Sequence, residues 1–407
     1  MSKSHGLHLE SLPPEILLDG VFPYLSAFPT IMQLRQVCRR FKFLISTSAR
    51  SFRHLDLSSG LRPSKVFLNL VGPYVNSIHL VTPAYLLLKN LPRLHYLELT
   101  HLSLPPDTYE RYKQAFAALS LPSVRHFRCR SRTKTTSDEI AAMLRVLPGL
   151  VSVNLALRIT EWHEAAGECF NRPWKKLVIR IRLCPAGDAS ASLSKSVCSA
   201  VITSRDTLED FRYDFSFCSI RDYYRIVAEL RASTVIRRLA LTGLQWPHYV
   251  PLLDAIAQLK TLRRLSLVVP GMILPAFWAS LNNSASQLST LRIEGGVNIG
   301  HFLGCHALLQ RLRVLKISGI TDVKDPRTIL DFALATGKLR RLELIIGDTS
   351  KMDSDVRSAL LCLYWYWHVC HETWEGIFPL HSVSEEAFET VREKSIAQGW
   401  GRGTWYI

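Results

Sequence analysis

The residues best suited to chemistry lie in one segment, CLYWYWHVCHETWE at 362–375. His368 and His371 are three positions apart on an expected helix and Glu372 follows, so two imidazoles and a carboxylate could approach a zinc ion. Cys370 would lie well round the helix from both histidines, however, whereas zinc needs three or four converging ligands. We therefore predict no metal site here, and interpret the segment as an aromatic helix that packs on the rest of the chain.

Catalytic motifs are missing from the sequence. It has no GxGxxG, P-loop, HExxH or GxSxG pattern. The nine cysteines form no CxxC pair, and the first residues do not resemble an export signal, which favours reduced, mostly buried thiols. No apolar run reaches the ~18 residues typical of a membrane span. We expect a protein that is not an enzyme, needs no cofactor, and works in the cytoplasm, the nucleus or both.

The charge balance indicates what kind of partner the chain could have. There are 50 Lys and Arg against 34 Asp and Glu, a formal net charge of +16. Such an excess favours an acidic partner, such as nucleic acid, a phosphoprotein or an acidic protein face. Because the basic residues are spread along the chain, the excess could equally serve solubility alone.

One pattern, apolar-x-x-apolar-x-apolar, organises most of the chain. It occurs twelve times at intervals of 19–34 residues, mostly 23–30. Its fourth positions are Leu55, Ile78, Leu97, Phe127, Val153, Leu177, Phe211, Leu239, Leu265, Leu291, Leu315 and Leu342. Apolar residues two apart face the same side of a strand, so each ladder predicts a strand with one buried face. A regular series of such units indicates a repeat protein.

Helical spacing fills the intervals between ladders at 108–119, 138–147 and 250–259. One strand and one helix cannot bury their own apolar faces, whereas stacked units can. Residues 52–347 thus resemble leucine-rich repeats: an α/β solenoid with a curved parallel sheet on the concave side and helices on the convex side. The Asn or Cys usual after each strand is replaced by Leu102, Leu244 and Ile320, so we expect irregular turns. The stretch CPAGDASASLSKS is expected to form a surface loop.

The start of the chain has a different pattern. Pro13 and Pro14 suit the first turn of a helix, and Glu15 suits the positive end of its dipole. An apolar stripe continues through Ile16 and Leu17, and a second follows over 31–45. Such short helices make a poor core alone, so they either cap the first repeat or bind a partner.

The blocks LPPEILLDGVFPYL and VCRRFKFL, placed before FRHLDL, resemble an F-box over about residues 9–53. Phe52 stands where that family often has Trp. The resemblance implies a substrate receptor of an SCF-type cullin ubiquitin ligase, whose F-box binds a Skp-type adaptor and thereby the cullin. The adaptor contacts that it implies are Leu12, Pro13, Ile16, Leu17, Val21, Leu25, Leu34, Val37, Cys38 and Phe41.

The target would bind the repeats through solvent-facing basic residues of the strands. The predicted contacts are Arg128, Arg130, Lys176, Arg180, Arg238, Arg264, Arg292 and Lys316. Arginine rows can bind carboxylate or phosphate groups bidentately, so the target is expected to be acidic or phosphorylated. The alternative is a basic repeat module that binds nucleic acid or a protein scaffold without ligase assembly. Sparse aromatic residues among the solvent-facing positions disfavour single-stranded nucleic acid.

Three domains are expected from these patterns. Residues 1–51 would form the F-box helices, 52–347 the repeat solenoid, and 348–407 a C-terminal helical cap and tail.

Overall fold

The computed structural model describes residues 12–14, 17, 39, 53–57, 68–69, 71–81, 85–101, 120–159, 161–183, 187–244, 249–284, 287–320, 332 and 339–346. The chain divides into two compact units, Met1–Ser204 and Arg205–Ile407. The boundary falls inside the predicted solenoid, so the three-domain division stays a proposal. None of the described helices is long and apolar enough to cross a bilayer.

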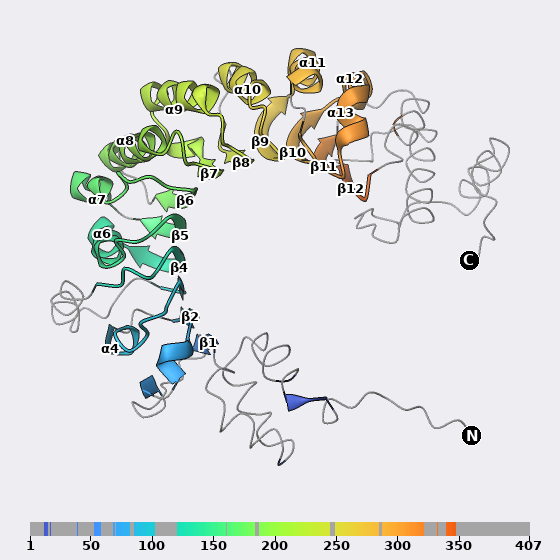
Figure 1. Ribbon diagram of the computed structural model, residues 1–407. Coiled ribbons are helices and arrows are strands. Elements are labelled where there is room, and N and C mark those ends of the chain that lie inside the picture. Colours follow the sequence, from blue (N-terminus) through green and yellow to red (C-terminus); the bar gives the residue numbers. More distant parts are fainter. Residues whose placement is uncertain are drawn as a thin grey trace, which may run out of the picture. The chain divides into compact units, whose positions relative to one another are not determined.

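The first unit is built on parallel strands that pair in the order of the sequence. They are β1 (His54–Leu57), β2 (Ser77–Leu80), β3 (Tyr96–Leu99), β4 (His126–Thr135), β5 (Ser152–Ile159) and β6 (Lys176–Leu183). The connections contain η5 (Gly72–Tyr74), α4 (Tyr85–Leu88), α6 (Ser137–Val146), α7 (Glu164–Glu168) and α8 (Gly187–Thr203). Helices α6, α7 and α8 cover one face of strands β4–β6, and none of the described helices lies on the other face (Figure 1).

Alternation along each strand explains this arrangement. In β5, Val153, Leu155, Leu157 and Ile159 are buried, while Ala156 is half-buried and Arg158 is exposed. Because side chains alternate across a strand, the buried set packs toward the helices and the other set faces solvent. The sequence of each strand therefore decides which face is core and which is available for contacts.

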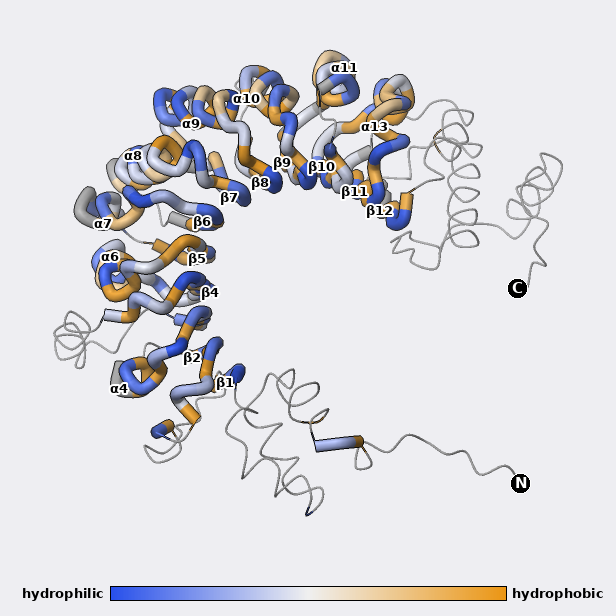
Figure 2. The backbone as a smooth tube through the Cα atoms, viewed as in Figure 1, coloured by the Kyte–Doolittle hydropathy of each residue, from blue (hydrophilic) through white to orange (hydrophobic). Residues whose placement is uncertain are grey.

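Helix α6 confirms the helix predicted at 138–147. Thr136 accepts a hydrogen bond from the Glu139 amide, and the Glu139 side chain accepts one from the Thr136 amide, forming a capping box. Ile140 and Leu144 are completely buried on its inner face. Figure 2 shows both hydrophobic and hydrophilic colours along α6, as expected of a helix with one buried face.

The surface loop predicted at CPAGDASASLSKS is wrong, because most of that stretch lies in α8. Glycine, serine and proline content suggested a loop, but Leu193, Val197 and Val201 recur at helical spacing and are buried. Ser194 is also fully buried, and Ser196 accepts a hydrogen bond from the Trp162 indole and donates one to the Ser192 carbonyl. Small side chains here allow close packing on α7 rather than breaking the helix.

The second unit repeats the same plan, with neighbouring parallel strands in sequence order. Its strands are β7 (Asp210–Asp214), β8 (Arg238–Thr242), β9 (Arg264–Met272), β10 (Thr290–Val297), β11 (Val314–Ile320) and β12 (Arg341–Ile346). The helices are η6 (Phe215–Phe217), α9 (Ile220–Ala232), α10 (Tyr249–Ala257), α11 (Pro275–Ser284), α12 (Ile299–Leu303) and α13 (His306–Arg311). Helix α10 confirms the helix predicted at 250–259, and Leu252, Leu253 and Ile256 are buried on it.

Glycines with left-handed backbone conformations mark the strand ends in the second unit. Gly271, Gly295 and Gly319 lie at or near the ends of β9, β10 and β11, each with positive φ. A Cβ on Gly319 would lie 2.7 Å from the Gly295 carbonyl oxygen, and one on Gly295 would lie 2.5 Å from that of Val269. The predicted irregular turns thus take the form of stacked glycine bulges, where the pairing register shifts.

All twelve ladders form the predicted strands, one ladder in each of β1–β12. The fourth position of each of the twelve ladders is buried, from Leu55 in β1 to Leu342 in β12. The helix predicted at 108–119, the candidate zinc segment at 362–375 and the C-terminal cap at 348–407 lie outside the described residues.

Candidate functional site

The N-terminal segment is described at a few of its predicted adaptor contacts. Pro13 is exposed and Leu12 is half-buried, so both offer apolar surface to a partner. Leu17 is fully buried, and its amide donates to the Pro13 carbonyl at 3.1 Å. Leu17 is therefore buried within the chain, and its contact with an adaptor stays a prediction. The other predicted contacts, Ile16, Val21, Leu25, Leu34, Val37, Cys38 and Phe41, lie outside the described residues.

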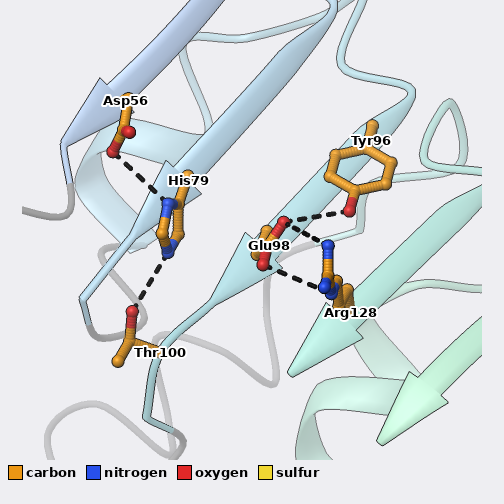
Figure 3. Close-up of polar contacts among 6 residues, drawn as sticks. All are labelled: Asp56, His79, Tyr96, Glu98, Thr100 and Arg128. Atoms are coloured by element: carbon orange, nitrogen blue, oxygen red, sulfur yellow. Dashed lines mark hydrogen bonds and ion pairs between the residues drawn. The ribbon is translucent and has the colours of Figure 1, made fainter. Parts of the chain in front are cut away.

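The solvent-facing side of β1–β3 carries polar side chains that bind one another (Figure 3). Asp56 Oδ1 lies 3.3 Å from His79 Nδ1, and His79 Nε2 lies 3.0 Å from Thr100 Oγ1. This carboxylate–imidazole–hydroxyl order also occurs in hydrolase triads. In this chain Asp56 lies opposite His79 on the adjacent parallel strand. We therefore interpret the three side chains as a row of polar contacts between neighbouring strands of the sheet.

A second group of polar contacts on the same face joins β3 to β4 through Glu98. The Tyr96 hydroxyl donates to Glu98 Oε2 at 3.0 Å, and Arg128 Nη1 donates to the same oxygen at 3.4 Å. Arg128 Nε also lies 3.3 Å from Glu98 Oε1, and both side chains are largely buried. The charge of Arg128 is therefore balanced by Glu98 on the neighbouring strand, and its role in target binding stays a prediction. We call Asp56, His79, Tyr96, Glu98, Thr100 and Arg128 the paired region.

Strands β4–β6 have the opposite charge composition. They contain eight Lys and Arg, four in β4, one in β5 and three in β6, and no Asp or Glu. Strands β1–β3 contain two acidic residues, Asp56 and Glu98, and no Lys or Arg. The two halves of the same sheet face thus differ strongly in net charge.

Register brings three exposed arginines of β4–β6 together. Arg130 pairs with Ala156, and Ala156 pairs in turn with Arg180, so the two arginines flank a small side chain. Arg158 lies two residues beyond Ala156 on the same face of β5. We call Arg130, Arg158 and Arg180 the arginine cluster; within the described part of the chain their side chains make no hydrogen bond or ion pair.

Sequence reasoning identified Arg130 and Arg180 but missed Arg158. The ladder motif LVSVNL ends at Leu155, whereas β5 continues to Ile159 and places Arg158 beside Lys134 of β4. The alternation L-A-L-R-I after the motif was the available signal. Lys176, also predicted, is half-buried at the start of β6.

Shifts in pKa reflect the burial and charge of these strands. The pKa of His126 is lowered, first by burial and then by the positive charges of Lys176 and His95. Burial raises the pKa of the Cys129 thiol to about 12 although arginines precede and follow it in sequence. Cys129 faces the core, so it remains a protonated apolar side chain and not a nucleophile.

The predicted arginines of the second unit form separate pairs. Arg238 and Arg264 are exposed and lie opposite each other on β8 and β9. Arg292 pairs in register with Lys316, and Lys316 pairs with Glu343 on β12. Arg212, by contrast, donates two hydrogen bonds to the Asp210 carboxylate, at 2.9 and 3.0 Å. These strands carry acidic residues among the basic ones, which separates them from β4–β6.

Comparison with known proteins gives one family and a set of solved structures. Residues 9–58 match the F-box-like family. No curated protein matches this chain. Among solved structures, the mouse RP105/MD-1 complex aligns with 14% identity and a TM-score of 0.37, covering 80% of this chain and 51% of the other, so the chain spans about half the length of that relative.

Two further structures resemble the chain at similar levels. The leucine-rich repeat-containing protein LegL7 from Legionella pneumophila is 14% identical, with a TM-score of 0.36 and coverage of 81% of this chain and 99% of LegL7. The yeast Rad7 and Elc1 complex aligns with 12% identity and a TM-score of 0.37, and the alignment covers 80% of this chain and 91% of the matched chain. The F-box-like match thus covers residues 9–58, and parallel strands paired in sequence order follow it, the arrangement expected of leucine-rich repeats.

Proposed function

We propose that the chain is the substrate-recognition subunit of an SCF-type cullin ubiquitin ligase. The F-box-like match at 9–58 carries this proposal, because it stands directly before a ladder of repeats. In this role the N-terminal segment binds a Skp-type adaptor and thereby the cullin, and the sheet face binds a target protein. The chain itself then needs no catalytic group, since the ligase assembly supplies ubiquitin transfer.

The geometry supports separate surfaces for the two partners. Exposed Pro13 precedes the repeats, whereas the arginine cluster lies on β4–β6. The positive charge of the arginine cluster favours an acidic or phosphorylated target. The same charge also supports the alternative function, direct binding of nucleic acid.

Adaptor binding is tested by co-purification of the full-length chain with a Skp-type adaptor. We expect a stable complex, and we expect Pro13→Asp to weaken it by at least about 30-fold, because a hot-spot contact typically contributes 2 kcal/mol or more. Pro92→Asp, an equally exposed proline in the turn before β3, is the matched control and should leave the complex intact. An adaptor that fails to co-purify with the unmodified chain would contradict the proposed function.

A further inference from the structure

Ala156 lies at the centre of a small concentration of positive charge. Its register partners on both sides are Arg130 and Arg180, whose Cα atoms are therefore about 10 Å apart, two strand spacings. Arg158 projects from the same strand face one side-chain position further along. Because alanine is short, the three long side chains can reach over it toward a common point.

We propose that the arginine cluster binds one phosphate monoester group carried by a segment of the target protein. The proposal rests on the proposed function, since it specifies the chemistry of the target. A phosphate monoester has three acceptor oxygens and a charge near −2. These suit three guanidinium groups that surround the short side chain of Ala156. Each arginine can donate two parallel hydrogen bonds, so one group can engage all three side chains.

The surroundings of the cluster favour binding of an anion. All three arginines are exposed, and no carboxylate occurs anywhere in β4, β5 or β6. The nearest acidic side chain on the neighbouring strand β3, Glu98, is already bound by Arg128 and Tyr96. Lys134 pairs in register with Arg158 and adds positive charge beside the cluster. An exposed ion pair contributes little alone, which is why a useful site requires several arginines acting on one group.

A phosphorylated peptide fits this surface better than nucleic acid does. Single-stranded nucleic acid binders place aromatic side chains between their basic residues for base stacking. On the sheet face that carries the arginine cluster, the residues of β4–β6 are Arg, Lys, His, Ser, Asn, Ala and Val, and no Phe, Tyr or Trp lies among them. The positive charge is also concentrated around one alanine and does not extend along β1–β3.

The test uses the purified full-length chain and an immobilised library of peptides with a central phosphoserine, phosphothreonine or phosphotyrosine. Matched libraries carry the unmodified residue or glutamate at the same position, and an oligothymidine is a further probe. We expect retention of the phosphorylated library at least about tenfold above the others. Equal retention of the glutamate library or the oligothymidine would show a general polyanion surface and overturn the proposal.

Substitutions then locate the binding. Arg158→Ala should reduce phosphopeptide retention about tenfold or more, the usual effect of losing a charge-assisted hydrogen bond. Arg145→Ala is the matched control, because Arg145 is an exposed arginine of the same unit on α6. If both variants lose binding equally, or neither does, the phosphate does not bind at the arginine cluster.

A second variant keeps all three arginines and fills the site instead. Ala156→Glu places a carboxylate between Arg130 and Arg180, where it should occupy the position of the phosphate and abolish retention. Ala156→Gln has the same size without the charge and should retain more binding. Undiminished retention by Ala156→Glu would overturn the proposal. Adaptor co-purification, measured on the same samples, should be unaffected by these variants; its loss in the unmodified chain would count against the proposed function and not against the phosphate site.

Discussion

The paired region and the arginine cluster lie on one face of one unit, but the charged side chains of the first have partners within the sheet and, among the described residues, those of the second do not. In the paired region, Glu98 is bound by Tyr96 and Arg128, and His79 lies between Asp56 and Thr100. In the arginine cluster, Arg130, Arg158 and Arg180 are exposed and have no such partners in the described part of the chain. Side chains that satisfy one another stabilise the fold, whereas like charges left together weaken it slightly and attract a partner.

The difference also shows why counts of basic residues locate a binding surface poorly. Arg128 and Arg130 are two residues apart on the same side of β4, but only Arg128 is neutralised by a residue of a neighbouring strand. Register between strands decides this, since Glu98 lies opposite Arg128. The sequence shows both arginines, but it does not show which side chain of the neighbouring strand lies beside each of them.

The largest expected effect comes from making the paired region resemble the cluster. Glu98→Arg should destabilise the chain by about 2 kcal/mol or more, because it removes the partner of the largely buried Arg128 and adds a like charge beside it. Urea unfolding measures the change. Glu168→Arg on the exposed side of α7 is the control and should shift stability by less than about 0.5 kcal/mol. Equal stability of the two variants would show that Glu98 is not needed to balance Arg128.

A smaller effect is expected at the other end of the paired region. His79→Ala should lower stability by about 1 kcal/mol, since it removes the side chain that joins Asp56 to Thr100. The same unfolding experiment measures it, with His306→Ala on the exposed face of α13 as control. A change no larger than that of the control would mean that this end of the paired region contributes little to the fold.

The fold could be predicted well from the sequence because each strand is specified by the local alternation of apolar and polar residues. Each ladder motif contains its own buried pair, as Leu239 and Leu241 do in β8, so strands could be placed without knowledge of their neighbours. Helix α8 was mistaken for a loop because its small residues resemble turn composition, and only packing on α7 distinguishes the two. Composition reports local preference, whereas burial of Leu193 depends on tertiary contacts.

The candidate site was only partly predictable for a related reason. Arg130 and Arg180 directly follow their motifs and could be placed on the solvent-facing side. Arg158, by contrast, lies three residues past the end of its motif, where β5 continues to Ile159. The pairing of Arg128 with Glu98 depends on two strands separated by 30 residues. The glycine bulges near the ends of β10 and β11 likewise depend on contact between backbones of neighbouring repeats.

Matched substitutions at two arginines of the same sheet face test the central distinction most directly. Arg128→Gln should destabilise the chain by about 1–3 kcal/mol, because Glu98 loses its charged partner in a largely buried position. Arg158→Gln should leave stability unchanged or raise it by a few tenths of a kcal/mol, because it relieves repulsion from neighbouring cations. Urea unfolding of the two full-length variants beside the unmodified chain gives the comparison. If Arg158→Gln destabilises the chain as much as Arg128→Gln does, the cluster is structural and its charge is not reserved for a partner.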